Sequence, residues 1–302
     1  MSIPLFDCHC DTIYRCLNEG GSLRKNRFQL DLERLHAFSP SAQVFAVCSE
    51  KQTGAKEDAE IMLSLLRSEL EASSDIVRLC LSHEDLARAA DEGKIAALIS
   101  IEGCEQIYSL DHAYRLGARI LHITWNYDNE LCGAAVIGGG GLTEKGRAFV
   151  KKAQSTGFAL DMSHISERGF WDTLELADKP VIAGHSNSKA LCDVPRNLTD
   201  EQYIALARMG GGAGINLYPE FLGLGRDLEA AAEHIEHFLE LGGERAVFLG
   251  CDLDGIPCMP KGMTGIESIG ELYNVLLRRN YPEKLTRDIF WNNLYEIMGR
   301  ML

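Results

Sequence analysis

The chain has 302 residues, 46% of them hydrophobic and 25% charged, which is ordinary globular composition with enough apolar residues for a sizeable core. Its formal net charge of −14 argues against nucleic acid and anionic membranes as main partners, because both require a basic surface. It has ten cysteines without a CxxC motif and no run of eighteen apolar residues, so we expect a reduced, cytoplasmic protein without a spanning helix.

Short apolar runs recur along the chain and alternate with segments of helical spacing. The runs are apolar almost throughout, which is typical of parallel strands buried on both faces. The predicted strands cover residues 5–9, 43–48, 95–101, 118–124, 158–163, 180–185, 212–216 and 246–252. The predicted helices cover residues 58–73, 82–92, 144–155, 166–177, 199–209, 228–241 and 268–279, with a final helix over 293–302.

This alternation determines the expected fold. Helix start signals support it, since Ser82 precedes two acidic residues and Thr199 opens a near capping box. Eight strands alternating with helices in about 300 residues predict a TIM-like (β/α)8 barrel, with a doubly wound open sheet as the alternative. No repeat or linker divides the chain, so we expect one domain over residues 1–302.

The least regular region is 125–142, which contains the four consecutive glycines 138–141. A loop of this length after a strand is usually functional. No GK[ST] sequence follows the glycines, so we interpret the region as a flexible loop over the barrel mouth rather than as a phosphate cradle.

Polar residues of metal-binding type stand at the ends of the apolar runs. His9 and Asp11 are two residues apart, so in an extended segment they point to the same side, and we expect Asp7 on that side too. Later runs end in further residues of this type: Glu102, His164, His185 and Asp252. Active sites of such barrels lie at the carboxyl ends of the strands, where these side chains would meet.

Three histidines with carboxylates suit zinc or a similar ion, and this number of ligands fits two ions with a shared carboxylate better than one. The other histidines give weaker signals. We expect His234 and His237 on a solvated helix face and His122 in the core, and we find no converging partners for the remaining three, His36, His83 and His112.

With these residues, the chain resembles the membrane (renal-type) dipeptidase family, peptidase family M19, in its soluble microbial form. The resemblance spans nearly the whole chain. It rests on six segments: DCHCDT from residue 7, SIEG from 100, LDMSH from 160, GHSNSKALCDVPRNLTDEQ from 184, GINLYPEFL from 214 and GCDLDG from 250.

The resemblance implies roles for individual residues. His9 and Asp11 would bind one Zn²⁺, His164 and His185 the other, and Glu102 together with a water or hydroxide would bridge them. Arg196 would hold the terminal carboxylate of the substrate, and Asp252 would handle its amine and the proton. It assigns Tyr218 to substrate binding, and it gives Asp254 no direct role.

The chain departs from the family after the fourth strand. Where family members often carry a substrate-contacting histidine, Trp125 is present, and an indole donates one N–H but accepts no proton. Either Trp125 or Asn126 then offers a different donor, or substrate preference has shifted.

These residues lead to a functional prediction. The expected activity is zinc-dependent hydrolysis of short peptides with a free C-terminal carboxylate, with Asp252 and Glu102 as catalytic residues. The first alternative is a related barrel enzyme acting on another amide, a lactone or a phosphoester. The second is a catalytically silent binding protein. The expected partner is a small-molecule dipeptide substrate, without nucleic acid or membrane, and the family likeness implies a homodimer.

Overall fold

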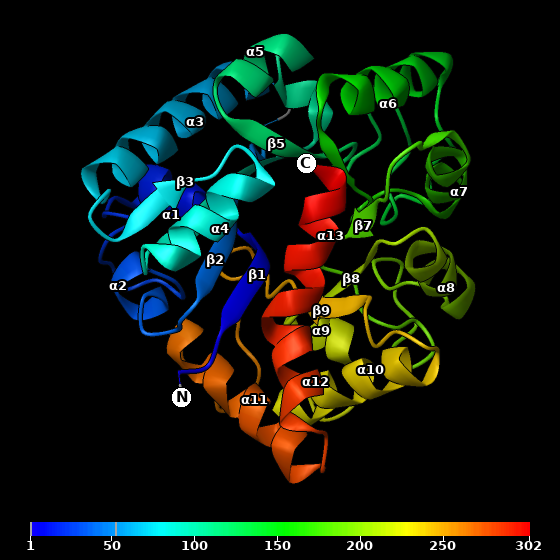
Figure 1. Ribbon diagram of the computed structural model, residues 1–302. Helices are drawn as coiled ribbons and strands as arrows, with labels where there is room; N and C mark the ends of the chain where they lie inside the picture. The colour runs from blue at the N-terminus through cyan, green and yellow to red at the C-terminus, as the bar shows by residue number, and fades with distance from the viewer. Residues whose placement is uncertain (1, 52) are drawn as a thin grey trace.

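The computed structural model describes residues 2–51 and 53–302, and its centre is a closed barrel of parallel strands (Figure 1). The strands follow one another around the barrel, and pairing of β2 with β4 closes it. The barrel strands are β1 (Leu5–Cys10), β2 (Ser41–Val47), β4 (Ile95–Glu102), β5 (Ala118–His122), β6 (Ala159–Asp161), β7 (Ile182–Ala183), β8 (Gly212–Ile215) and β9 (Val247–Leu249). This closure confirms the predicted (β/α)8 barrel and makes the open-sheet alternative wrong.

One short strand lies outside the predicted set. β3 (Val77–Leu79) pairs with the first half of β4, while β5 pairs with the second half of β4. The sequence prediction missed β3 because its three residues, Val-Arg-Leu, include a charged one and do not form a continuous apolar run like those of the predicted strands.

Helices surround the barrel (Figure 1). They are α1 (Thr12–Glu19), α2 (Leu32–Leu35), α3 (Ala55–Ala72), α4 (His83–Asp91), α5 (Leu110–Arg115), α6 (Glu144–Thr156), α7 (Glu167–Leu176), α8 (Asp200–Arg208), α9 (Pro219–Leu222), α10 (Leu228–Glu240), α11 (Ile269–Arg278), α12 (Glu283–Arg287) and α13 (Asn293–Met301). Each predicted helix is present within a few residues of its expected ends, and the short helices α1, α2, α5, α9 and α12 were not predicted. The capping box is formed, because Thr199 Oγ1 accepts from the Gln202 N–H and the Gln202 side chain accepts in return. None of the described helices is long and apolar enough to cross a membrane.

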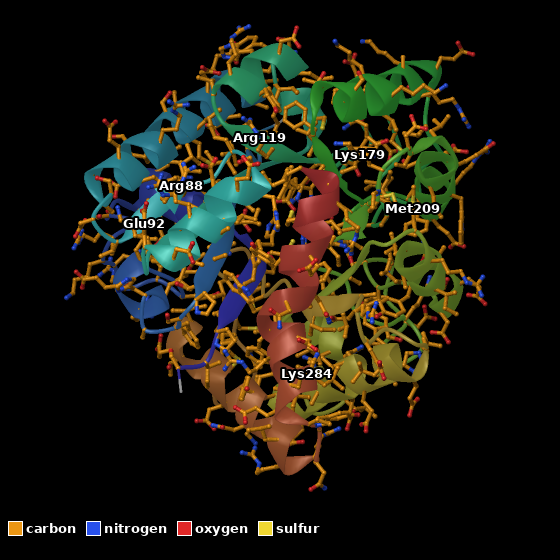
Figure 2. The ribbon with its side chains drawn as sticks, in the orientation of Figure 1. Arg88, Glu92, Arg119, Lys179, Met209 and Lys284 are labelled. Carbon is orange, nitrogen blue, oxygen red and sulfur yellow. The ribbon has the colours of Figure 1, made fainter. Side chains whose placement is uncertain are left out.

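The barrel interior is a small apolar core, separate from the larger core between strands and helices. It contains Phe6 and Cys8 from β1 and the inward side chains of six other strands, and α13 covers one end of it with Leu294 and Met298. In Figure 1, α13 crosses the middle of the view in front of the strands, and Lys179 Nζ donates to Met301 O (3.1 Å) at the end of α13 (Figure 2). The functional residues lie at the other, carboxyl end of the strands.

A bulge in β1 determines which of its side chains reach that end. Asp7 is opposite Gln43, but Cys10 is already opposite Phe45, so the alternation is broken between them. Asp7 therefore does not share the side of His9. It accepts from Gln43 Nε2 (2.9 Å) and from the backbone N–H of Cys251 (2.6 Å), and the expectation that it faces the same side as His9 is wrong.

Candidate metal centre

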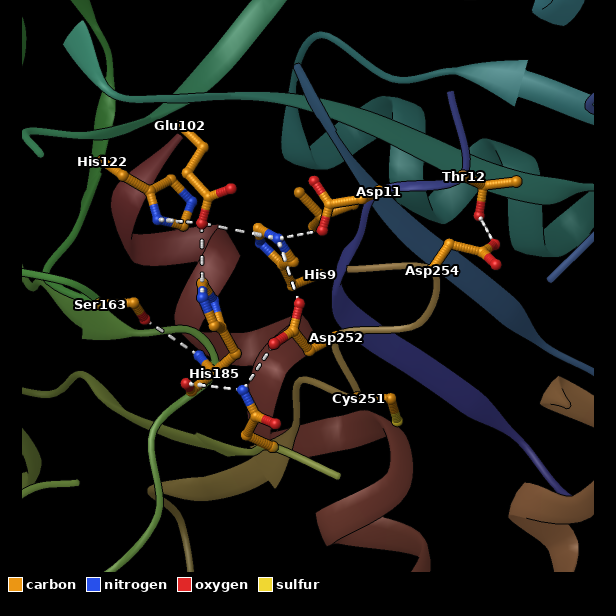
Figure 3. A network of polar contacts seen from close by, with 12 residues as sticks. His9, Asp11, Thr12, Glu102, His122, Ser163, His185, Cys251, Asp252 and Asp254 are labelled. Atoms are coloured by element: carbon orange, nitrogen blue, oxygen red, sulfur yellow. Dashed lines mark hydrogen bonds and ion pairs between the residues drawn. The ribbon is translucent and has the colours of Figure 1, made fainter. Parts of the chain in front are cut away.

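Side chains from five strand ends converge at the mouth of the barrel (Figure 3). Glu102 is at the centre of the group. Its Oε1 lies 2.9 Å from Nε2 of His164, 3.4 Å from that of His185 and 3.7 Å from that of His9. His9 Nε2 in turn lies 3.1 Å from Asp11 Oδ2 and 3.8 Å from Asp252 Oδ1. The structure thus brings together all six residues that the sequence pattern predicted to meet.

These side chains are buried and their hydrogen bonding is incomplete. His9 and His185 are fully buried, and Glu102 is 2% exposed. Within residues 2–51 and 53–302, Glu102 Oε1 and the Nδ1 atoms of His9 and His185 have no hydrogen-bond partner. Unpaired buried polar atoms cost free energy unless another group satisfies them. A set of imidazole nitrogens and carboxylate oxygens at this spacing fits divalent metal ions, so the chemistry of the site agrees with a metal cofactor.

Electrostatics in the site favour a bound cation. Burial alone would raise the pKa of Glu102, but the adjacent imidazoles of His9 and His164 lower it well below its usual range. The Glu102 and Asp11 carboxylates overcome the effect of burial on His9 and raise its pKa to about 10. Burial, together with Asp11 and Glu102, raises the pKa of Asp252 to about 7, although His9 opposes this. Carboxylates this close repel one another unless positive charge lies between them.

A second layer of residues orients the ligands. His164 Nδ1 lies 2.8 Å from Asn126 Oδ1, and an amide oxygen only accepts, so Nδ1 carries the proton and Nε2 presents its lone pair to the site. Asn216 Nδ2 donates to Asp252 Oδ2 (2.9 Å). Sequence reasoning missed Asn216 and gave Asn126 only as a substitute donor, because an amide at a loop position carries no pattern of its own.

Backbone strain is concentrated at the same place. His164, Asp252 and Asp254 have φ values of 70°, 60° and 67°, in the left-handed region that residues other than glycine rarely adopt. Such conformations persist where the surroundings hold them, and they are common at functional sites.

A cavity of about 260 Å³ opens above these residues. Asp11, Glu102, His164 and Asp252 contribute to its lining, and Arg196 does so as well. Further lining residues are Trp125, Asn126, Val136 and Tyr218, so part of the irregular region 125–142 does border the barrel mouth.

Arg196 is 5% exposed and donates only long hydrogen bonds, to Ser186 Oγ (3.4 Å) and His185 O (3.5 Å). Within residues 2–51 and 53–302, no carboxylate lies within 4 Å of its guanidinium. A buried guanidinium without an ion pair is suited to binding an anionic group of a ligand.

Asp254 and His234 have contacts that indicate structural rather than catalytic roles. Asp254 accepts from Thr12 Oγ1 (2.6 Å) and from the backbone N–H of Gln29 (2.8 Å) and Leu30 (3.2 Å), so it joins loops beside the site. His234 is fully buried rather than on a solvated helix face, so that expectation is wrong.

Comparison with known proteins gives a consistent result. The model of the membrane dipeptidase family (peptidase family M19) matches residues 1–301. An uncharacterized Klebsiella pneumoniae protein from the pqqA 5′ region is 32% identical over 254 residues, which are 78% of this chain and 93% of that protein.

Two solved structures are similar over their whole length. A Rhodobacter sphaeroides metallopeptidase, liganded with a phosphinate mimic of the dipeptide L-Ala-D-Ala, is 25% identical with a TM-score of 0.92, and all of both chains is covered. The dipeptidase AC, a metallopeptidase of family M19, is 26% identical with a TM-score of 0.90, with 100% of this chain and 99% of that chain covered. The chain therefore belongs to the membrane dipeptidase family, peptidase family M19, and is a metal-dependent dipeptidase.

Proposed function

We propose that the chain hydrolyses dipeptides that have a free C-terminal carboxylate, and that it does so with two Zn²⁺ ions. The observation that carries this proposal is the position of Arg196 on the same cavity as the metal-type residues. Its guanidinium is buried and has no ion pair among the described residues. The Rhodobacter relative, which binds a phosphinate mimic of a dipeptide, supports the same substrate class.

The ligands divide into two groups around Glu102. His9 and Asp11 would hold one ion, and His164 and His185 the other, with Glu102 between them. The distance of 2.9 Å between Nε2 of His164 and Nε2 of His185 supports this grouping, because both lone pairs then face one position. Zn²⁺ is the proposed metal because imidazole and carboxylate together suit it.

When bound, such ions polarise the scissile carbonyl and make a nucleophilic water available at neutral pH. The protein's own residues do the rest. Arg196 holds the substrate carboxylate in a bidentate contact, which limits the substrate to short peptides. Tyr218 and Trp125, both on the cavity wall, would contact the substrate beside Arg196.

Asp252 is suited to moving the proton. Its Oδ2 accepts from Asn216, which leaves Oδ1, 3.8 Å from His9 Nε2, free to take a proton from the attacking water. A pKa of about 7 lets the same carboxyl give that proton to the departing amine at neutral pH.

The test is a substrate panel with metal content measured on the same zinc-loaded sample. We expect turnover of free dipeptides and loss of most activity on dipeptides with an amidated C-terminus. For Arg196→Lys, KM for free dipeptides should rise about tenfold or more with a smaller change in kcat, because lysine cannot form the bidentate contact. Equal turnover of free and amidated substrates would contradict the role of Arg196. Activity that survives His164→Ala combined with His185→Ala would contradict the ligand assignment.

A second candidate function follows from Trp125. It is on the cavity wall, and an indole changes which substrate groups can be hydrogen-bonded there. N-acyl amino acids, lactones and phosphoesters therefore belong in the panel, and their preferential turnover would favour this alternative.

Two expectations about the setting of the protein are also proposals. The ten free cysteines support a reduced, cytoplasmic location. The family likeness supports a homodimer, which sedimentation would test.

A further inference from the structure

His122, the last residue of β5, lies beside Glu102 among the metal-type residues (Figure 3). It is fully buried, and neither ring nitrogen has a hydrogen-bond partner among the residues that the structure describes. In the neutral ring, one of these nitrogens carries a proton and the other a lone pair. Leaving both nitrogens unsatisfied in the interior costs free energy, so we expect this imidazole to have a partner.

Two carboxylates face the two ring nitrogens. His122 Nε2 lies 3.5 Å from Asp161 Oδ2, and His122 Nδ1 lies 4.0 Å from Glu102 Oε1. The ring therefore stands between an acid that belongs to the metal centre and one that does not.

Asp161 is built to face His122. Its Oδ1 accepts the backbone N–H groups of Ser163 and Gly184, both at 2.9 Å, which fixes the carboxylate. Its Oδ2 has no hydrogen-bond partner in the described part of the chain. A Cβ on Gly184 would lie 2.0 Å from this oxygen, so only glycine leaves room for it. A buried carboxylate held in this way is the usual partner of the second nitrogen of a metal-binding histidine.

One ring nitrogen of His122 belongs to a compact set of possible ligand atoms. One atom from each of His9, Glu102, His122 and His185 lies within 4.8 Å of all the others. Tetrahedral ligands about 2.1 Å from an ion are roughly 3.4 Å apart. Since His185 and His9 are 3.4 Å and 3.7 Å from Glu102 Oε1, the 4.0 Å of His122 needs a movement of only a few tenths of an ångström.

We propose that His122 supplies a fourth imidazole to the metal centre through Nδ1, and that Asp161 is the positioning residue that accepts its Nε2–H. The inference rests on the proposed metal centre and adds a ligand to it. The competing interpretation is that His122 is a core residue, as its position within a strand suggested, and that it meets only Asp161.

The test uses the full chain loaded with Co²⁺ in place of Zn²⁺. We would measure the bound metal, its affinity by chelator competition, and the visible absorption of the Co²⁺. Proton NMR would count the paramagnetically shifted ring N–H signals, because each coordinated histidine gives one. Wild type should bind two equivalents and show four such signals. His122→Gln, which keeps a polar amide beside Asp161, should show three ring N–H signals. It should also bind one ion at least tenfold more weakly and have an altered visible absorption. Asp161→Asn should keep the ligand but weaken that ion roughly tenfold.

His234→Gln is the matched control, because His234 is equally buried but lies outside the site, and its spectrum and both affinities should equal those of wild type. Unchanged signals, absorption and affinities in His122→Gln would overturn the inference. Three signals in wild type would do so without any variant. Wild type that binds no metal would instead overturn the proposed function, so the two failures are distinguishable.

Discussion

His122 and His234 are both fully buried, yet their surroundings give them different roles. His234 Nδ1 accepts the backbone N–H of Ser188 (3.1 Å), and its Nε2 lies 3.3 Å from Leu222 O. This arrangement satisfies a neutral ring completely and leaves nothing for a ligand. The nitrogens of His122 are instead unsatisfied and face two carboxylates, so burial alone does not decide what a histidine does.

The neutral state of His234 leads to a prediction about pH. Burial lowers its pKa to about 4, whereas a histidine in the unfolded chain titrates near 6.5. Below pH 6.5 the unfolded state therefore binds the proton and the folded state does not, so stability falls as pH falls. Between pH 7 and pH 5 this histidine alone should lower the free energy of unfolding by about 2 kcal/mol.

Urea unfolding at the two pH values, in chelator so that metal loss does not contribute, measures the effect. His234→Gln should lose about 2 kcal/mol less than wild type between pH 7 and pH 5. His36→Gln, which alters an exposed histidine, should behave as wild type does. Equal pH dependence in wild type and His234→Gln would show that the ring is not held neutral.

Individual residues differ in how far the sequence reveals them. His9, Glu102 and His185 could be predicted to meet because each ends an apolar run, and barrel geometry gathers such ends. Asn126 and Asn216 could not, because their effect depends on which neighbour the fold brings within hydrogen-bond distance. His234 was misjudged because the acidic residues around it mark a solvated helix face, while its own side turns inward.

At the scale of elements, glycines let β7, β8 and β9 approach one another at the barrel mouth. A Cβ on Gly214 would lie 1.9 Å from the Gly184 carbonyl oxygen, and a Cβ on Gly250 would lie 1.7 Å from the same atom. These are backbone contacts, which cannot move aside as a flexible side chain can. The strands that carry His185 and Asp252 therefore depend on glycine for their spacing.

Gly214→Ala tests this dependence. We expect a loss of about 3 kcal/mol in the free energy of unfolding, at the upper end of the usual cost of overpacking, together with weaker metal binding. Gly270→Ala in α11 is the matched control. There the new Cβ meets only Ile3 Cδ1 at 3.4 Å, and alanine favours a helix, so stability should rise slightly. Denaturant titration of both variants gives the comparison, and a Gly214→Ala protein as stable as wild type would contradict the close-approach argument.

Elements with a long pattern in the sequence were predictable. The helices α3, α6 and α10 show their period over many residues, and each barrel strand lies within a continuous apolar run, even where the strand itself is short. α1 starts two residues after β1, so its pattern merges with the strand, and the bulge in β1 is invisible in a run that is apolar on both faces.

At the scale of the whole molecule, the barrel is closed differently at its two ends. α13 covers one end with apolar side chains, whereas the other end gathers the carboxylates of Asp11, Glu102 and Asp252. In a chain with a net charge of −14 these acids add repulsion where the strands come together. Ions bound there would offset that repulsion, so metal binding should stabilise the fold as well as serve catalysis.

Calorimetry with and without a chelator measures that stabilisation. An ion present at a thousand times its dissociation constant raises the free energy of unfolding by about 4 kcal/mol for one site. Removing it should therefore lower Tm by roughly 8 °C. Asp252→Asn removes one repelling carboxylate while leaving the proposed ligands in place, so its metal-free form should melt above metal-free wild type. An unchanged Tm on metal removal would contradict this prediction. It would mean that the imidazoles and hydrogen bonds of the site are enough to offset the desolvation and mutual repulsion of these buried carboxylates.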